Sequence, residues 1–293
     1  MPEGKWSVAH KMWDPVIVIK GAGDVATGIA HRLHRARFTH LLMVEIPEPL
    51  CVRRAVAFSE AVYEGGAEVE GVKAVLIDGL RLLAKVWEKG AVAVMVDPEW
   101  KAVEALKPHI VIDAIMAKKN LGIRKEEAAL VIGVGPGFTA PKDVDVVVES
   151  KRGHDLGKAL YEGSAEPYTG FPGEVMGYSR ERVLRSPVAG MVKHVKAIGD
   201  EVKKDDIILY VGDNQVLGPF DGVLRGLIRE INVTAGEKIG DIDPRGIKEY
   251  CYTISDKARS IGGGVIEAIL HWITRPHKVK EIKRPGAKLQ KWT

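Results

Sequence analysis

Residues 16–28 read VIVIKGAGDVATG, and this stretch decides the fold. Four β-branched residues in a row predict a buried strand. Two glycines then turn the chain into a helix, in which apolar residues recur every four positions. Gly21, Gly23 and Ala26 fit the glycine pattern of dinucleotide-binding turns. In such turns a glycine lets the backbone approach a phosphate, and free N–H groups at the helix start point at the anion.

A second strand, residues 41–44, follows this helix and ends at Glu45, which lies 22 residues after Gly23. A carboxylate at that place can bind the ribose hydroxyls of a nucleotide. Asp24 puts a negative charge where the phosphate would lie, unless it caps the helix or interacts with its positive end. The alternative is a tight turn that binds no nucleotide. The candidate residues of the predicted nucleotide site are Gly21, Gly23, Asp24, Thr27, Gly28 and Glu45.

The composition is that of a globular protein long enough for two domains. Its 293 residues are 46% hydrophobic and 28% charged, which is enough apolar surface for a core. The net charge of +4 is too small to indicate binding to nucleic acid. Two cysteines without a Cys-x-x-Cys pair give neither a metal cluster nor a disulfide framework, which favours the reducing cytoplasm. No apolar run has membrane length and no signal-peptide core begins the chain, so we expect a cytoplasmic protein that binds no membrane.

Strands and helices alternate between residues 15 and 156. This alternation is typical of an α/β fold, and we expect a Rossmann-like, doubly wound parallel sheet that forms a nucleotide-binding domain over 15–156. Ligands of such sheets bind outside the carboxyl ends of the strands. The expected strands after the second one are 73–77, 91–96, 109–112, 129–134 and 144–148, with helices at 80–89 and 100–107.

Basic and small residues follow several of these strand ends. Basic side chains there can hold a phosphate or another oxyanion, although Arg53 and Arg54 are equally well explained as a surface pair. His154 can transfer a proton or bind a metal, but a structural hydrogen bond beside Asp155 is the favoured explanation. No second histidine stands at metal-binding spacing, so we expect no metal site. The candidate residues of these loops are Arg53, Arg54, Asp113, Lys118, Lys119, Asn120, Gly135, Gly137, Arg152 and His154.

A second pattern begins after residues 157–182, which we interpret as a linker or a loop packed over the sheet. Within 183–246 a pattern of short strands repeats imperfectly at an offset of 31 to 32 residues, which predicts a small all-β domain. This segment resembles the barrel-sandwich hybrid of biotinyl and lipoyl carriers. Those carriers bear their cofactor on a lysine between the two halves, and residues 211–217 contain none. We therefore expect the domain to dock a partner, complete a cleft or form a homo-oligomer contact.

The last segments are a C-terminal helical segment, 247–275, and a basic tail, 276–293. Three consecutive glycines, 262–264, would each cost about 1 kcal/mol against alanine inside a helix. They predict a break with a helix beginning near Val265, and close helix packing is the alternative. Residues 1–14 are expected to form a flexible arm and the basic tail a solvated extension.

Five stretches together resemble one family, the YqeB-type accessory proteins of selenium-dependent molybdenum hydroxylases. The likeness extends over nearly all of residues 15–272, and the family's Rossmann part is similar to maturation factors of the xanthine dehydrogenase type. The resemblance implies a role in maturing or inserting the molybdenum cofactor, with a hydroxylase subunit as partner, and it supplies no catalytic residues. The stretches that carry it are 21–28, 52–63, 116–120, 135–138 and 152–157.

Three functions remain open at this point. In the first, the protein is a maturation factor that binds a nucleotide or the dinucleotide form of the molybdenum cofactor. In the second, it is an NAD-dependent oxidoreductase, because Glu45 would repel the 2′-phosphate of the phosphorylated dinucleotide. In the third, it is a scaffold for hydroxylase assembly that has no nucleotide affinity.

Overall fold

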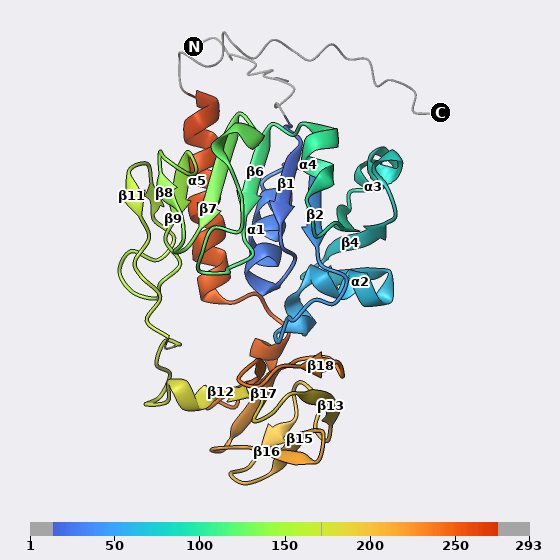
Figure 1. Ribbon diagram of the computed structural model, residues 1–293, viewed down its shortest axis with the longest axis vertical. Coiled ribbons are helices and arrows are strands. Elements are labelled where there is room, and N and C mark those ends of the chain that lie inside the picture. The colour runs from blue at the N-terminus through green and yellow to red at the C-terminus, as the bar shows by residue number, and fades with distance from the viewer. Residues whose placement is uncertain (1–13, 171, 275–293) are drawn as a thin grey trace, which may run out of the picture.

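The first domain is built on a large, mostly parallel β-sheet (Figure 1). The computed structural model describes residues 14–170 and 172–274, so that nearly all of the expected arm and the whole basic tail lie outside the described residues. Within them the sheet has nine strands, of which only the edge strands β3 and β10 are antiparallel to their neighbours. In spatial order the strands are β10 (Ala159–Leu160), β9 (Val146–Val148), β7 (Leu130–Val134), β6 (Ile110–Asp113), β1 (Ile17–Lys20), β2 (Leu41–Glu45), β5 (Val92–Val96), β4 (Val72–Ile77) and β3 (Gly66–Val69).

The chain changes direction across the sheet at β1. It proceeds from β1 to β2 on one side and later returns to place β6 on the other side, and both pairs are parallel. The carboxyl ends of β1 and β6 are therefore adjacent while their following loops diverge. In open parallel sheets a crevice forms at such a point. Every strand expected in the first domain is present, within a few residues of the predicted bounds.

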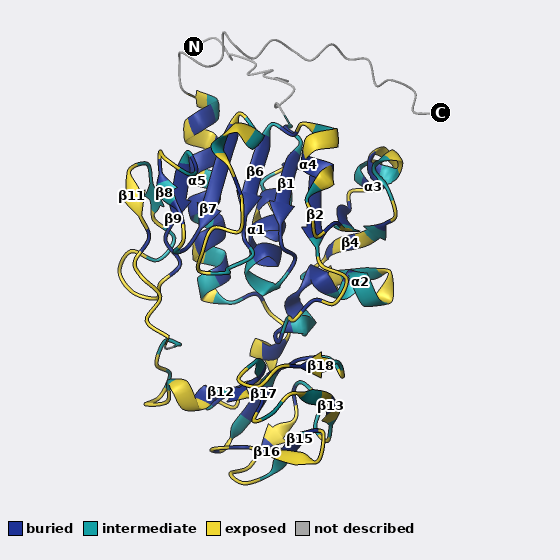
Figure 2. Cartoon of the chain, in the orientation of Figure 1, coloured by how far each residue is buried: buried dark blue, intermediate teal, exposed yellow. Residues whose placement is uncertain are grey.

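Helices cover both faces of this sheet, and the central strands are therefore buried on both sides (Figure 2). Ile17 and Ile19 face one core together with α1 and α5, and Val18 faces a second core together with α3 and α4. The helices are α1 (Asp24–Arg35), α2 (Ala61–Glu64), α3 (Leu83–Glu88), α4 (Lys101–Leu106) and α5 (Asp256–Thr274). Short 3₁₀ turns span Arg54–Val56, Phe58–Glu60, Leu80–Leu82, Lys125–Glu127, Arg180–Arg182 and Lys248–Cys251.

Helix α5 is continuous through its three glycines, so the predicted break is wrong and close packing is the explanation. A Cβ added at Gly28 of α1 would lie 2.6 Å from the Cβ of Ala258 in α5. A Cβ at Gly262 would lie 3.1 Å from the side chain of Arg32, and one at Gly264 would overlap the carbonyl of Gly157. The glycines thus let α5 approach α1 and the loop before β10, and this packing outweighs their low helix propensity.

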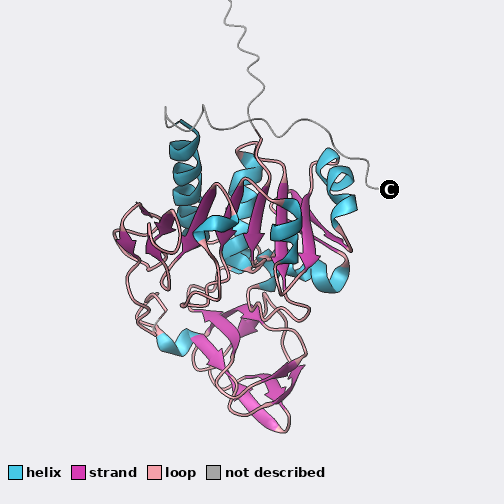
Figure 3. Ribbon diagram, turned by 45° about the horizontal axis from the view of Figure 1, so that its top comes forward, coloured by secondary structure: helices cyan, strands magenta, loops and turns pink. Residues whose placement is uncertain are grey.

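The second domain, called here the β domain, consists of two antiparallel four-stranded sheets (Figure 3). The strands of the first half recur in the second, as β13 with β17, β14 with β18 and β15 with β19, which confirms the repeat. The halves interlock, because β14 pairs with β17 and β18 pairs with β13. One sheet is β12 (Val183–Arg185), β19 (Lys238–Asp243), β17 (Gly222–Leu227) and β14 (Glu201–Val202), and the other is β16 (Asn214–Leu217), β15 (Ile207–Val211), β13 (Gly190–His194) and β18 (Asn232–Val233).

The segment between the domains, expected to be a linker or a covering loop, contains two short paired strands. β10 joins the large sheet, and β11 (Gly163–Ser164) pairs with β8 (Thr139–Ala140). The β domain lies beyond the carboxyl ends of the central parallel strands (Figure 1). Over the described residues, no helix combines the length and the apolar character needed to span a bilayer.

Two glycine-to-alanine substitutions test the packing of α5. Gly28→Ala is expected to lower the free energy of unfolding by about 1–3 kcal/mol, because the new methyl group meets Ala258. Gly263→Ala is the matched control, since nothing lies within 4 Å of its Cβ position, and it should raise stability by about 0.5–1 kcal/mol. Urea denaturation measures both, and a stabilised Gly28→Ala variant would refute the close α1–α5 contact.

Candidate functional site

A cleft lies between the carboxyl ends of the parallel strands and the β domain. It has two adjoining cavities. The first, called the glycine-turn cavity, has a volume of about 540 Å³ and contains Gly21, Gly23 and Glu45 in its wall. The second, called the arginine cavity, has a volume of about 550 Å³. It is lined by Arg225 of β17 and by Arg182, which lies in the 3₁₀ turn before β12. Arg53 lines both cavities.

The glycine turn is held in place by its own hydrogen bonds. Gly21 has a φ of +94°, and its N–H donates to the Val44 carbonyl at 2.8 Å. A Cβ at Gly21 would lie 3.2 Å from the backbone of Ile115, so glycine is required both for conformation and for space. Thr27 is fully buried, where its hydroxyl donates to the Ala22 carbonyl at 3.1 Å. Thr27 therefore supports the turn from behind and does not reach the cavity.

Glu45 binds the backbone on either side of it. Oε2 accepts a hydrogen bond from the N–H of Ala22, and Oε1 accepts one from the N–H of Ile46, both at 2.8 Å. Burial raises the pKa of Glu45 above its ordinary value, although these two amides oppose the shift. The carboxylate has lone pairs left for hydroxyl donors in the cavity. It also occupies an amide that a phosphate at the glycine turn would need.

Asp24 is the acidic residue in the first turn of α1, whose N-cap is Gly23 and which has no side-chain cap. Of the two alternatives to a clash with phosphate, this position fits an interaction with the positive helix end and not a cap. Its charge also acts on neighbouring cations. Burial lowers the pKa of Arg53 and of Lys257, and the negative charge of Asp24 opposes this lowering in both. Asp24 therefore lies as an internal counter-charge at the boundary between the two cavities.

Cys51 is a cavity residue that the sequence analysis missed. Its Sγ lies 3.9 Å from the position that a Cβ would take at Gly23. Burial, and then the charge of Asp24, raises the pKa of the thiol to about 12. The thiol is thus protonated at neutral pH. The only signal in the sequence is its place six residues after Glu45, which is too general to identify it.

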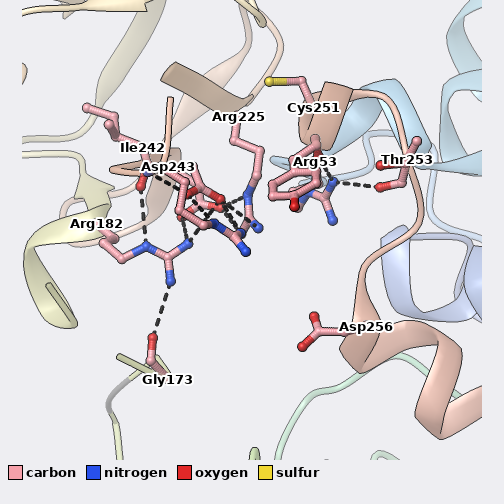
Figure 4. Close-up of polar contacts among 12 residues, drawn as sticks. Arg53, Gly173, Arg182, Arg225, Ile242, Asp243, Cys251, Thr253 and Asp256 are labelled. Atoms are coloured by element: carbon pink, nitrogen blue, oxygen red, sulfur yellow. Dashed lines mark hydrogen bonds and ion pairs between the residues drawn. The ribbon is translucent and has the colours of Figure 1, made fainter. Parts of the chain in front are cut away.

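Arg53 is 6% exposed and has no carboxylate partner within 4 Å among the described residues (Figure 4). Nη2 donates to the carbonyls of Tyr250 and Thr253, at 2.8 and 3.0 Å. Nε is buried and lacks a hydrogen-bond acceptor in that same part of the chain. Desolvation lowers the pKa of this guanidinium, and the nearby charge of Arg225 lowers it further. A buried, partly unsatisfied cation at the junction of two cavities is a strong candidate for ligand binding.

Two further arginines of the cavity are paired with aspartates (Figure 4). Arg225 binds Asp241 through Nε at 2.9 Å and approaches Asp243 at 3.3 Å. Arg182 lies 3.7 Å from Asp241 and donates to the Ile242 carbonyl at 3.4 Å. Burial opposes ionisation of both aspartates, but the arginines hold the pKa of each below its ordinary value. These pairs fix the wall of the cavity.

Seven of the sixteen residues proposed from sequence line the cleft, and nine do not. Those that line it are Gly21, Gly23, Asp24, Glu45, Arg53, Lys118 and Arg152. Those that do not are Thr27, Gly28, Arg54, Asp113, Lys119, Asn120, Gly135, Gly137 and His154.

Most of the nine have structural roles. Gly28 packs against α5, and Arg54 donates to the Leu227 carbonyl of the β domain. Asn120 closes its own loop through the Ile123 carbonyl. Asp113 is buried, which raises its pKa to about 6. His154 is exposed on a turn.

The other two glycines of this group, Gly135 and Gly137, are required for space. A Cβ at Gly137 would lie 2.7 Å from the backbone of Lys119, and one at Gly135 would lie 2.5 Å from the Ser150 hydroxyl. Over residues 14–170 and 172–274, no three histidine, cysteine or acidic side chains gather in a group that could hold a metal ion.

Slow alkylation of Cys51 is expected from its raised pKa. At pH 8 the native thiol should react with iodoacetamide roughly 30-fold more slowly than a free cysteine, because three pKa units of lost thiolate outweigh the gain in nucleophilicity. Peptide mapping by mass spectrometry separates Cys51 from Cys251, and the urea-unfolded chain is the control. Labelling of native Cys51 at the unfolded rate would contradict the raised pKa of its thiol.

Comparison with known proteins gives one close relative in sequence. No family model matches the chain. "Uncharacterized protein YqeB" of Escherichia coli (strain K12) is 45% identical over 263 residues, which cover 89% of this chain and 48% of that protein. Among solved structures, an aspartoacylase family protein from Mesorhizobium loti superposes with a TM-score of 0.22 at 8% identity, over 69% of this chain and 56% of that one. The product-bound ectoine utilization protein EutE from Ruegeria pomeroyi gives 0.25 at 10% identity, over 78% and 84%.

These structural scores are too low to support a shared fold or activity. The sequence match is different in kind, because it extends over almost the whole described chain at high identity. The chain spans about half the length of that relative, and over the region they share it belongs to the YqeB-type family.

Proposed function

We propose that this protein binds a nucleotide-bearing molecule in the cleft between its domains. The ligand we favour is the dinucleotide form of the molybdenum cofactor, handled in the cytoplasm during maturation of a selenium-dependent molybdenum hydroxylase. The observation that carries the binding proposal is Arg53, a buried guanidinium without a carboxylate partner in the described chain, at the junction of two cavities. The family resemblance supports the molybdenum hydroxylase as partner.

The first domain supports the proposal through its topology. The glycine turn follows β1, the acid ends β2, and the strand order changes direction between β1 and β6, as in Rossmann-like nucleotide-binding sheets. The two interlocked halves of the β domain are similarly in keeping with a barrel-sandwich arrangement. In this proposal the β domain completes the cleft, since Glu237 and Lys238 line the glycine-turn cavity.

The two cavities differ in a way that suits a nucleotide. The glycine-turn cavity has apolar walls that include Ile46, Leu50 and Met116, against which a base can pack. Glu45 lies in the same cavity and can accept hydrogen bonds from ribose hydroxyls. Arg53 then meets the phosphate, to which its Nη1 group can donate.

An NAD-dependent oxidoreductase is the second candidate, and Glu45 is the observation that favours it. A carboxylate at the end of β2 accepts the free ribose of NAD and repels a 2′-phosphate. Titration with NADH, followed by its fluorescence, tests this candidate directly. Hydride transfer to any carbonyl substrate would make the protein an oxidoreductase.

Mass spectrometry of small molecules released from the purified protein tests the leading proposal. Release of a molybdopterin dinucleotide, together with capture of a molybdenum hydroxylase subunit by the tagged chain, is the expected result. Capture of the hydroxylase by a chain that binds no nucleotide in calorimetry would make the protein a scaffold and refute the binding proposal.

A substitution at Glu45 separates ribose recognition from folding. In wild type we expect ribonucleotides to bind about 10-fold more tightly than their 2′,3′-dideoxy counterparts, because hydrogen bonds to a carboxylate contribute about 1.5 kcal/mol. Glu45→Gln should reduce this preference to about 2-fold, as measured by isothermal titration calorimetry.

Glu48→Gln is the matched control, because Glu48 is exposed on the same loop and lines neither cavity. It should keep the full preference for the ribonucleotide. An unchanged preference in Glu45→Gln would remove Glu45 from the ribose site, whatever the absolute affinities.

A further inference from the structure

The arginine cavity carries more positive charge than its own carboxylates neutralise. Nine basic and three acidic side chains line it. Four of the basic ones have a carboxylate within 4 Å: Lys151, Arg152, Arg182 and Arg225. The other five have none among the residues that the structure describes, and they are Arg53, Lys118, Arg185, Lys238 and Lys257.

The glycine turn is poorly suited to supply the missing anion site. The N–H of Gly21 donates to the Val44 carbonyl, and that of Ala22 donates to the Glu45 carboxylate. These amides are therefore already satisfied inside the protein. The carboxylate of Asp24 adds a negative charge at the same helix start, which disfavours a phosphate there.

Arg53, which lines the cavity, has donors that the described chain does not engage. Its two carbonyl partners engage only Nη2, while Nε is buried without an acceptor in the described chain. A buried guanidinium is costly unless a counter-charge meets it. With Nη2 engaged by the two carbonyls and Nε buried, Nη1 is the group that can donate to a phosphate oxygen.

Two lysines reach the cavity from elements that are remote in sequence. Lys257 lies in the first turn of α5, and Lys238 begins β19. Burial lowers the pKa of Lys257, the carboxylate of Asp24 opposes this, and the like charges of Arg152 and Lys238 lower it further. The two lysines thus repel each other in the absence of an anion, and neither ammonium group has a hydrogen-bond partner within the described chain.

We propose that the arginine cavity binds a diphosphate, or an oxyanion of equal charge, through Arg53, Lys238 and Lys257. The anion-binding groups of the cleft then come from the segment after β2, from the β domain and from α5, and the glycine turn shapes the neighbouring nucleoside cavity. This inference rests on the proposed function in one respect: the diphosphate belongs to the nucleotide whose nucleoside occupies the glycine-turn cavity.

Calorimetric titration of the full chain with inorganic pyrophosphate tests the proposal. Pyrophosphate should bind wild type at least 10-fold more tightly than inorganic phosphate does. Lys257→Gln and Lys238→Gln should each weaken pyrophosphate binding by about 5- to 10-fold, and the double variant by 30-fold or more. Because neither lysine side chain makes a hydrogen bond in the described chain, both variants should fold, which circular dichroism and urea denaturation check.

Lys85→Gln is the matched control, because Lys85 is exposed on α3 and lines neither cavity. It should bind pyrophosphate as wild type does. Equal binding by the control and the two cavity variants, or no binding of pyrophosphate to wild type, would overturn the inference.

A second arm uses an unphosphorylated nucleoside, so that the two proposals can fail separately. Nucleoside binding that depends on Glu45, without pyrophosphate binding, would leave the nucleotide proposal standing and remove the arginine-cavity site. Lysine-dependent pyrophosphate binding, with no affinity for any nucleoside or nucleotide, would do the reverse.

Discussion

Four consecutive residues after β2 hold the two domains together and shape the cleft. Cys51 lies against the glycine turn, and Val52 is buried in the core of the β domain, where its carbonyl accepts the N–H of Leu227 at 2.8 Å. Arg53 turns back to the carbonyls that precede α5, and Arg54 donates to the Leu227 carbonyl at 2.9 Å. Successive side chains of one short segment thus contact the parallel-sheet domain, the β domain and α5.

The buried charges of the cleft follow from the same arrangement. Charges inside a protein are tolerated when they are paired and hydrogen-bonded. Asp241 and Asp243 meet Arg225, and the carboxylate of Asp243 also binds Arg245 at 2.6 Å. These aspartates are occupied by the arginines of the β domain, which leaves Arg53 to face the cavities. The network therefore defines which cation remains available to a ligand.

The local patterns of the sequence predicted the parts of the fold that depend on neighbours in the chain. The strand before Gly21, the helix after it and the repeat of the β domain were all visible as periodicity or self-similarity. The continuity of α5 was not visible in this way, because its glycines are explained by close contacts with Gly28 and Gly157, which are more than 100 residues away. Propensity alone disfavours that helix, and tertiary contact decides it.

The candidate site shows the same division between local and long-range information. Gly23, Glu45 and Arg53 could be named because each follows a strand end, where ligands of parallel sheets bind. Arg225, Lys238 and Lys257 could not, since they belong to β17, β19 and α5, and nothing in a local pattern directs these elements to the mouth of the sheet.

The division of the cleft into an apolar and a cationic cavity is best explained by a ligand that has both characters. A purely apolar ligand would leave Nε of Arg53 without an acceptor and no carboxylate within 4 Å of the guanidinium in the described chain, and a small anion alone would leave the walls around Leu50 and Met116 uncovered. Arg53 contributes to both walls, so the joint between the apolar and the anionic part of the ligand falls beside it. Because that residue is fixed by carbonyls on the segment that leads from the β domain into α5, a ligand bound there contacts both domains at once, and its binding energy adds directly to the cohesion of the cleft.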